Sequence, residues 1–202
     1  MRPSETQKNR WSTGDEHLVE IPSRDHARLL IEGYDPASND QKEEKQRILD
    51  FIDRHLNILD RDCMPGHLTA SALVVDSSGK RGLLHLHRKL GRWLQLGGHC
   101  DGDGNLPHTA WREAVEESGI VGLTIDPRIV DVDIHKIPSH GDVPKHLHLD
   151  VRFIAHAPEG AVPVICDESD DLRWYRRDEL RDIDTDHSVL RLFQRSHGME
   201  FS

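Results

Sequence analysis

Residues 97–120 read GGHCDGDGNLPHTAWREAVEESGI, a glycine-rich loop followed by a segment with helical periodicity. Gly119 suits the position just after a helix ends, where a left-handed backbone is common. Within this helix Glu113, Glu116 and Glu117 are spaced i, i+3 and i+4, and residues at that spacing share one face. The sequence therefore predicts three carboxylates crowded on one face of a short helix, directly after a glycine loop.

The crowded carboxylates have two competing explanations. Like-charged pairs at this spacing destabilise an isolated helix by roughly 0.2–0.5 kcal/mol each, so the arrangement needs compensation. A divalent cation would supply it, because hard cations bind several oxygen ligands at once. The alternative is a solvated acidic helix face, which needs no ligand. The glycine loop and the adjacent Arg112-Glu113 pair favour the cation site.

These residues resemble the Nudix box, the signature of the Nudix hydrolase family. The signature is a glycine, five residues, a glutamate, seven residues and then R-E-U-x-E-E-x-G-U, where U is apolar. Gly98 takes the first position, and the segment 112–120 matches every later fixed position in register. The resemblance extends over about residues 67–197, and its specificity is concentrated in the box.

One box position departs from the family pattern. Gly104 stands where the family has its first glutamate, which mainly helps to orient the box arginine. Without that glutamate, we expect Arg112 to pair with Asp101, Asp103 or Glu116 instead. The departure bears on how active the chain is as an enzyme.

The resemblance implies an α/β fold, a Nudix-type α/β/α sandwich on a mixed sheet, here with an N-terminal helical extension. It also implies Mg²⁺, with Mn²⁺ as a substitute, bound by Glu113, Glu116, Glu117 and the backbone carbonyl of Gly98. Arg112 would orient the glutamates. A metal favours hydrolysis of a diphosphate because it neutralises the phosphate oxygens and lowers the pKa of a bound water.

A general base is also needed, and the sequence leaves its identity open. The box glutamates are candidates, and Glu168 is our candidate from a loop across the site. Glu168 lies in the acidic run 167–171, which reads DESDD, so the alternative is an ordinary solvated loop.

The basic segment before the glycine loop is a candidate phosphate contact. Arg88, Lys89 and Arg92 offer the donors that phosphate recognition favours. The alternative is a charged surface turn. His85 and His87 alternate with apolar residues just before it and are weaker candidates for the same cleft.

A second candidate substrate surface lies on the strand expected at 146–156. His146, His148, Asp150 and Arg152 share one face of this strand by alternation. We expect His148 or Asp150 to line the substrate pocket. The alternatives are a solvent-facing side of the strand, or buried histidines satisfied by hydrogen bonds.

Composition narrows the class of protein. The 202 residues carry a formal net charge of −10, which disfavours duplex nucleic acid and anionic membranes as partners. The chain shows no spanning segment or signal pattern, so we expect a cytoplasmic protein that acts on a small nucleotide-type molecule. The three cysteines, Cys63, Cys100 and Cys166, are too few and too widely spaced for a disulfide framework.

Apolar periodicity divides the chain into an extension of residues 1–62 and a hydrolase domain of residues 63–202. In the extension we expect helices over 22–31 and 39–59, the second with Ser38 as N-cap, forming a lid or a dimer element. The apolar stripe of that second helix is Ile48, Ile52, Leu56 and Leu59. In the domain we expect strands over 68–75, 82–87, 123–134, 146–156, 162–165 and 172–175, and a final helix over 188–196.

The leading functional hypothesis is a magnesium-dependent hydrolase of a nucleoside diphosphate linked to another group. The alternative, suggested by Gly104, is a weakly active or inactive Nudix-fold sensor or scaffold that binds a nucleotide. An isoprenoid diphosphate isomerase shares the architecture, but Cys100 does not match its catalytic cysteine. The substrate itself and the oligomeric state, with a homodimer as one option, are beyond the sequence.

Overall fold

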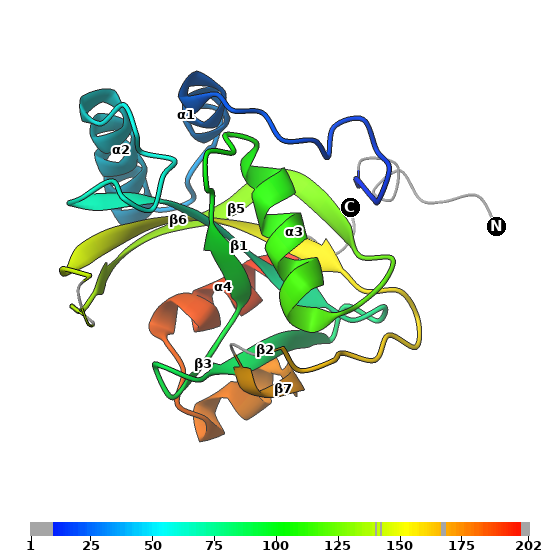
Figure 1. The fold of residues 1–202 in the computed structure, drawn as a ribbon. Helices are drawn as coiled ribbons and strands as arrows, with labels where there is room; N and C mark the ends of the chain where they lie inside the picture. Colours follow the sequence, from blue (N-terminus) through cyan, green and yellow to red (C-terminus); the bar gives the residue numbers. More distant parts are fainter. Residues whose placement is uncertain (1–9, 140, 142, 167–168, 199–202) are drawn as a thin grey trace.

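The computed structural model describes residues 10–139, 141, 143–166 and 169–198, which form one sheet with helices on both faces (Figure 1). The helices are α1 (Arg24–Glu32), α2 (Asn39–Arg54), α3 (Leu106–Ser118) and α4 (His187–Gly198), with a 3-10 helix, η2, at Arg177–Asp182. The strands are β1 (Gly66–Val75), β2 (Arg81–His87), β3 (Arg92–Leu94), β4 (Leu96–His99), β5 (Thr124–Ile137), β6 (His146–His156) and β7 (Ser169–Arg176).

The sheet is mixed and has seven strands, with β3, β2, β1, β6 and β5 in that order. β1 runs parallel to β6 and antiparallel to β2, and β5 runs antiparallel to β6. The other edge of β1 is shared, because residues 69–72 pair with β4 while Val74 and Val75 pair with β2. β2 and β4 therefore separate along this edge of β1, and β4 carries the glycine pair of the box.

Alternation along β1 separates two apolar layers. Leu68, Ala70, Ala72 and Val74 belong to the cluster that includes the buried residues of α1, α2 and α3. Leu73 and Val75 pack instead with α4, through residues such as Val189, Leu192 and Phe193. In Figure 1, α4 accordingly lies on the opposite side of β5 and β6 from α1 and α2. The expected α/β/α sandwich on a mixed sheet is confirmed.

The N-terminal helices begin where the sequence predicts. Ser23 and Ser38 cap α1 and α2, and each side chain accepts a hydrogen bond from the backbone N–H three residues later. α2 ends at Arg54, however, rather than at residue 59, and Leu56 is 83% exposed. Placing Leu56 in the apolar stripe was wrong, because His55 is extended and helical spacing stops there. None of the described helices is long and apolar enough to cross a bilayer.

The strand expected over 162–165 is absent from the described structure. Val162, Val164 and Ile165 are exposed, and this segment runs as a loop past the end of α3. Its backbone makes one anchoring contact, from Val164 N–H to the carbonyl of Ser118. A short apolar run without an available sheet edge does not form a strand, so periodicity alone misled here.

The extension packs on the same core as the sheet. Ile31, Ile48 and Ile52 lie in one apolar cluster with β1 and α3, and Trp11 forms a β-bridge with Ile125 of β5. The division into residues 1–62 and 63–202, and a lid or dimer role for the extension, stay predictions.

Candidate active site

Helix α3 presents its charged face toward the glycine strand β4. Ala110 and Ala114 are fully buried beside this face, and Pro107 lies in the first turn, where a missing N–H costs nothing. Gly119 ends the helix with φ of 63°, a left-handed conformation that favours glycine. The helix end predicted at Gly119 is therefore confirmed.

Glu113 lies directly over Gly98. A Cβ added at Gly98 would overlap the Glu113 carboxylate, so the close approach of helix and strand requires a glycine at this position. Burial raises the pKa of Glu113, and the adjacent Arg112 guanidinium opposes that rise. The box thus places a carboxylate against the backbone whose carbonyl the sequence proposes as a metal ligand.

Glu117 lies against the neighbouring glycine of β4. Its Oε2 accepts a hydrogen bond from the Gly97 N–H at 2.8 Å, and its side chain is almost fully buried. Its Oε1 lies 3.7 Å from Nδ1 of His85 on β2, which also contacts the Ser169 hydroxyl at 2.9 Å. Burial lowers the pKa of His85 to about 4, so this ring is neutral near pH 7.

Arg112 holds the outer edge of the carboxylate face. Its Nη1 lies 2.7 Å from Glu113 and 3.4 Å from Glu116, and its Nη2 donates to the carbonyl of His99 at 3.0 Å. Glu116 is the exposed member of the trio. Of the partners expected for Arg112, Glu116 is therefore the one it contacts.

The two aspartates named as other partners for Arg112 are engaged elsewhere. Asp101 forms a salt bridge with Arg61. Asp103 accepts hydrogen bonds from Ile21 N–H, Asn105 N–H and the His108 ring. Burial raises the pKa of Asp103, but these hydrogen bonds outweigh it and hold the pKa below its usual value.

Packing of the extension explains the missing box glutamate. A Cβ at Gly104 would overlap the backbone carbonyl of Ser23, just before α1. Gly104 also donates its N–H to the carbonyl of Ile21 at 2.7 Å, and the Asn105 side chain binds the carbonyls of residues 17 and 19. The N-terminal segment therefore occupies the space that a side chain at position 104 would need.

The three box carboxylates do not converge on one point. Within the described part of the chain, one trio of histidine, cysteine or acidic residues has ligand atoms mutually within 4.8 Å, and it is not the box trio. Arg112 lies between Glu113 and Glu116, while Glu117 faces Gly97 and His85. Roles for these residues stay predictions.

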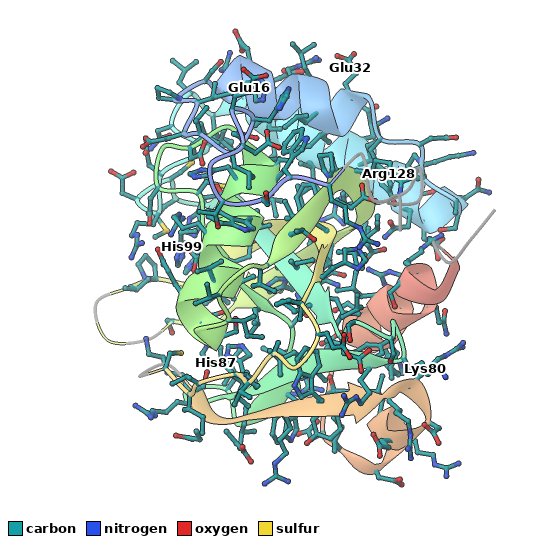
Figure 2. The ribbon with its side chains drawn as sticks, turned by 90° about the vertical axis from the view of Figure 1, so that its right-hand side faces the viewer. Glu16, Glu32, Lys80, His87, His99 and Arg128 are labelled. Carbon is teal, nitrogen blue, oxygen red and sulfur yellow. The ribbon has the colours of Figure 1, made fainter. Side chains whose placement is uncertain are left out.

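The two arginines of the basic turn form ion pairs with aspartates from other segments of the chain. Arg88 donates to Asp170 at 2.8 Å, and Arg92 donates to Asp184 at 3.1 Å. Lys89 lies exposed in the turn after β2. Figure 2 shows His87, the residue just before this turn, and His99 on the left of the molecule, with Lys80 and Arg128 on the right.

The polar face of β6 is covered, so the solvent-facing interpretation was wrong for Asp150 and Arg152. Arg152 is only 2% exposed and donates to Asp150 at 2.7 Å. Asp150 also accepts from the hydroxyls of Thr69 and Ser71 on β1. His148 is half-buried among other histidine rings, so these two candidates for the substrate pocket have different surroundings.

An ion network that sequence reasoning did not identify continues across β5. Arg152 lies within 3.4 Å of Asp131 and 3.3 Å of Asp133, and Arg191 of α4 binds both aspartates. Burial lowers the pKa of Arg152, but the three surrounding carboxylates raise it further, so the guanidinium stays charged. In the sequence, the only hint of this network is that Asp131 and Asp133 alternate and so share one face of a strand. Recognising Arg152 as their partner requires the pairing of β5 with β6.

The two remaining candidates are Glu168 and Cys100. Glu168 lies outside the described residues, so its role as general base stays a prediction. Cys100 is fully buried, and burial raises the pKa of its thiol. A thiol in that state is a poor nucleophile, which argues against an isomerase that needs a catalytic cysteine.

One family model matches most of the chain. A NUDIX domain model matches residues 65–194. A NUDIX-family hydrolase structure from Clostridium perfringens is 28% identical, with 66% of this chain and 98% of that chain covered and a TM-score of 0.49. An Ap4A hydrolase from C. elegans, solved as a binary complex, is 18% identical over 65% of this chain and 95% of its own, with a TM-score of 0.52, and shows a shared fold. No curated protein matches significantly.

Proposed function

The chain belongs to the Nudix hydrolase family, and we propose that it is a Mg²⁺-dependent hydrolase that cleaves a diphosphate linkage in a nucleoside diphosphate joined to another group. The observation that carries this proposal is the contact of two box carboxylates, Glu113 and Glu117, with the glycine pair of β4. The net charge of −10 favours a small nucleotide-type substrate over duplex nucleic acid.

The donor set fits a hard divalent cation. Glu113, Glu116 and Glu117 offer carboxylate oxygens along one helix face, and the resemblance to the box adds the backbone carbonyl of Gly98 as a candidate ligand. When bound, Mg²⁺ would neutralise phosphate oxygens and lower the pKa of a water. Mn²⁺ prefers the same oxygen ligands and would substitute.

The chain's own groups have separate tasks in this proposal. Arg112 holds Glu113, Glu116 and the β4 carbonyl of His99 in one arrangement, so it is a positioning residue. Glu113 combines a half-buried carboxylate with a raised pKa, which suits a group that takes a proton from water. Glu117 and the sequence candidate Glu168 compete for that role.

The substrate contacts proposed from the sequence need rearrangement to act. Arg88 and Arg92 would exchange their exposed aspartate partners for phosphate, which costs little because exposed ion pairs are weak. Lys89 is exposed beside them. His148 is the better candidate of the β6 pair, because the oxygens of Asp150 already accept hydrogen bonds from Thr69, Ser71 and Arg152.

A product-resolved screen tests the activity. The chain is incubated with Mg²⁺, and separately with excess chelator, over dinucleotides, nucleotide sugars and oxidised nucleoside triphosphates. We expect at least one of these classes to release a phosphate-containing product when Mg²⁺ is present. We expect no product when excess chelator is present. Failure to process any class, with Mg²⁺ or Mn²⁺, would contradict the proposal.

The second candidate function is a nucleotide-binding sensor or scaffold of the same fold. Gly104 in place of the first box glutamate and the divergent box carboxylates favour it. Tight binding of a nucleotide by calorimetry, without turnover even when Mn²⁺ is supplied, would support this function over hydrolysis.

A further inference from the structure

A group of histidines gathers at the start of strands β1 and β6. His67 on β1 lies directly opposite His148 on the parallel strand β6, and His146 is two residues before His148 on the same face. The strands approach closely here, since a Cβ at Gly66 would come within 2.7 Å of the Leu147 carbonyl oxygen. The three rings lie 4.9–5.1 Å apart between centroids.

The spacing of the ring nitrogens suits one small ion. One ligand nitrogen from each of His67, His146 and His148 can be chosen so that all lie within 4.8 Å of one another. Nε2 of His146 and Nε2 of His148 are 3.3 Å apart. Two nitrogens bound tetrahedrally at a Zn–N distance of about 2.0–2.1 Å are roughly 3.3–3.4 Å apart, so this pair already has the separation of two ligands.

The tautomer of His146 leaves its lone pair on the inward nitrogen. Nδ1 lies 2.9 Å from the carbonyl oxygen of Pro144, an acceptor, so Nδ1 must carry the proton. Nε2 is then unprotonated and directed at His148. A histidine that donates its second nitrogen to a backbone carbonyl is the arrangement common among metal ligands, because it fixes the ring orientation.

His67 supplies an independent observation. It is 1% exposed, and both of its ring nitrogens are buried without a well-formed hydrogen bond among the described residues, although the Cys63 backbone lies near enough to raise the pKa of the ring. Buried polar groups are almost always partnered, so an orphan ring here calls for an explanation. Burial also lowers the pKa of His67 and that of His148, which leaves both rings neutral and able to donate a lone pair.

We propose that His67, His146 and His148 form a second metal site, distinct from the box, that binds Zn²⁺ or a similar late first-row transition-metal ion. Imidazole nitrogen suits these ions, whereas Mg²⁺ prefers oxygen. Three protein ligands leave one tetrahedral position for water or another ligand. His148 is half-buried, so the group reaches the surface, and the rings of His99 and His135 adjoin it.

Cobalt substitution tests the site directly. The full chain is stripped with a chelator and titrated with Co²⁺, whose visible absorption is strong in four-coordinate nitrogen sites and weak in octahedral oxygen sites. We expect a strong band that saturates at one Co²⁺ per chain and disappears when Zn²⁺ is added. Competition with a chromophoric chelator then measures the Zn²⁺ affinity.

Variants identify the ligands. We expect His67→Ala and His148→Asn each to lower Zn²⁺ affinity at least about 100-fold, beyond the roughly 10–100-fold typical of losing an outer partner. His55→Asn is the matched control, because His55 lies at the end of α2 and stacks on Phe51. Glu113→Gln is expected to leave the cobalt band intact, which separates this site from the box.

Three outcomes would overturn the proposal. The first is a chain with no saturable Co²⁺ band, and the second is a band that both histidine variants retain. The third is loss of the band in Glu113→Gln, which would assign the ion to the box. Circular dichroism of the metal-free variants checks folding, and His146→Gln replaces any variant that does not fold.

Discussion

The box helix and the polar face of the sheet are both built around charged or titratable side chains, but they are assembled in different ways. The box carboxylates come from one turn and a half of α3 and meet a glycine pair no more than 20 residues earlier in the chain. The polar face combines residues of β1, β5 and β6, and Arg191 comes from α4. Local spacing is sufficient to find the first region, whereas strand pairing is needed to find the second.

The two regions also neutralise charge differently. In the box, Arg112 reaches two of three glutamates and one of these, Glu116, remains exposed. On the polar face, Arg152 is enclosed by three aspartates and Arg191 completes the network. The first arrangement leaves carboxylate oxygens for a ligand, and the second uses its oxygens internally. Substitutions should therefore affect activity in the first region and stability in the second.

Glu117→Gln should have the largest effect on activity. Gln keeps the size of the side chain and can still accept the Gly97 N–H bond, but it removes the buried negative charge. We expect kcat to fall by about 10²–10⁴-fold, the range for a positioned catalytic group, with the melting temperature little changed. Steady-state kinetics on the substrate identified by the screen measures this.

The exposed Glu159→Gln is the control for this substitution and should retain full activity. If Glu117→Gln were equally active, the assigned role of the box helix would be wrong.

Arg152→Met should have the largest effect on stability. It leaves Asp150 buried without its counter-charge and leaves Asp131 with Arg191 alone, and breaking a buried pair in this way costs about 3–5 kcal/mol. Urea unfolding measures the loss. Arg181→Met, which breaks the exposed pair with Asp182, should cost less than about 1 kcal/mol. Equal losses would show that the polar face is not an enclosed network.

Gly104→Ala tests whether the extension is packed rigidly on the box loop. The added Cβ would meet the Ser23 carbonyl, so we expect a loss of about 1–3 kcal/mol from overpacking. Gly33→Ala is the matched control, because its backbone is right-handed and its nearest contacts are ordinary. That control should be neutral or stabilising by up to about 1 kcal/mol. If Gly104→Ala did not change the free energy of unfolding, the backbone at Ser23 would have moved to accommodate the methyl group at little cost.

The smallest expected effect is a pH dependence from His156, at the far end of β6. Burial lowers the pKa of His156 to about 4, and Arg10 adds to the shift. The unfolded chain, with its ordinary pKa near 6.5, binds more protons between these values, so stability falls as the pH drops from about 6.5 toward 4. Between about pH 7 and 5.5 this group should account for a loss of about 1 kcal/mol.

His156→Gln should remove that share of the pH dependence. Urea unfolding at the two pH values, compared with the unsubstituted chain, gives the difference. If the difference in unfolding free energy between the two pH values were the same in both proteins, the pKa of His156 would not be shifted in the folded chain.

Sequence reasoning succeeded where a pattern is local. The N-cap Ser38, the C-terminal Gly119 and the box helix follow from spacing alone, because capping and helical periodicity involve residues within one or two turns. It failed at Leu56 and over 162–165, where apolar residues continue a pattern after the element has ended. Whether an apolar residue is buried depends on the surface available to it, which the pattern does not contain.

The amino-acid sequence by itself determined the family, the mixed α/β class and the carboxylate face of α3, since each depends on short-range spacing. Only the tertiary structure decided that Gly104 is required by the carbonyl of Ser23 and that Arg152 lies among three aspartates. It also decided that His67 meets His148, 81 positions further along the chain, because a parallel strand register brings them opposite each other. Such contacts depend on which strands become neighbours and on the register between them. The free energy that favours one strand order and register over others comes from packing throughout the core, so no local pattern contains it.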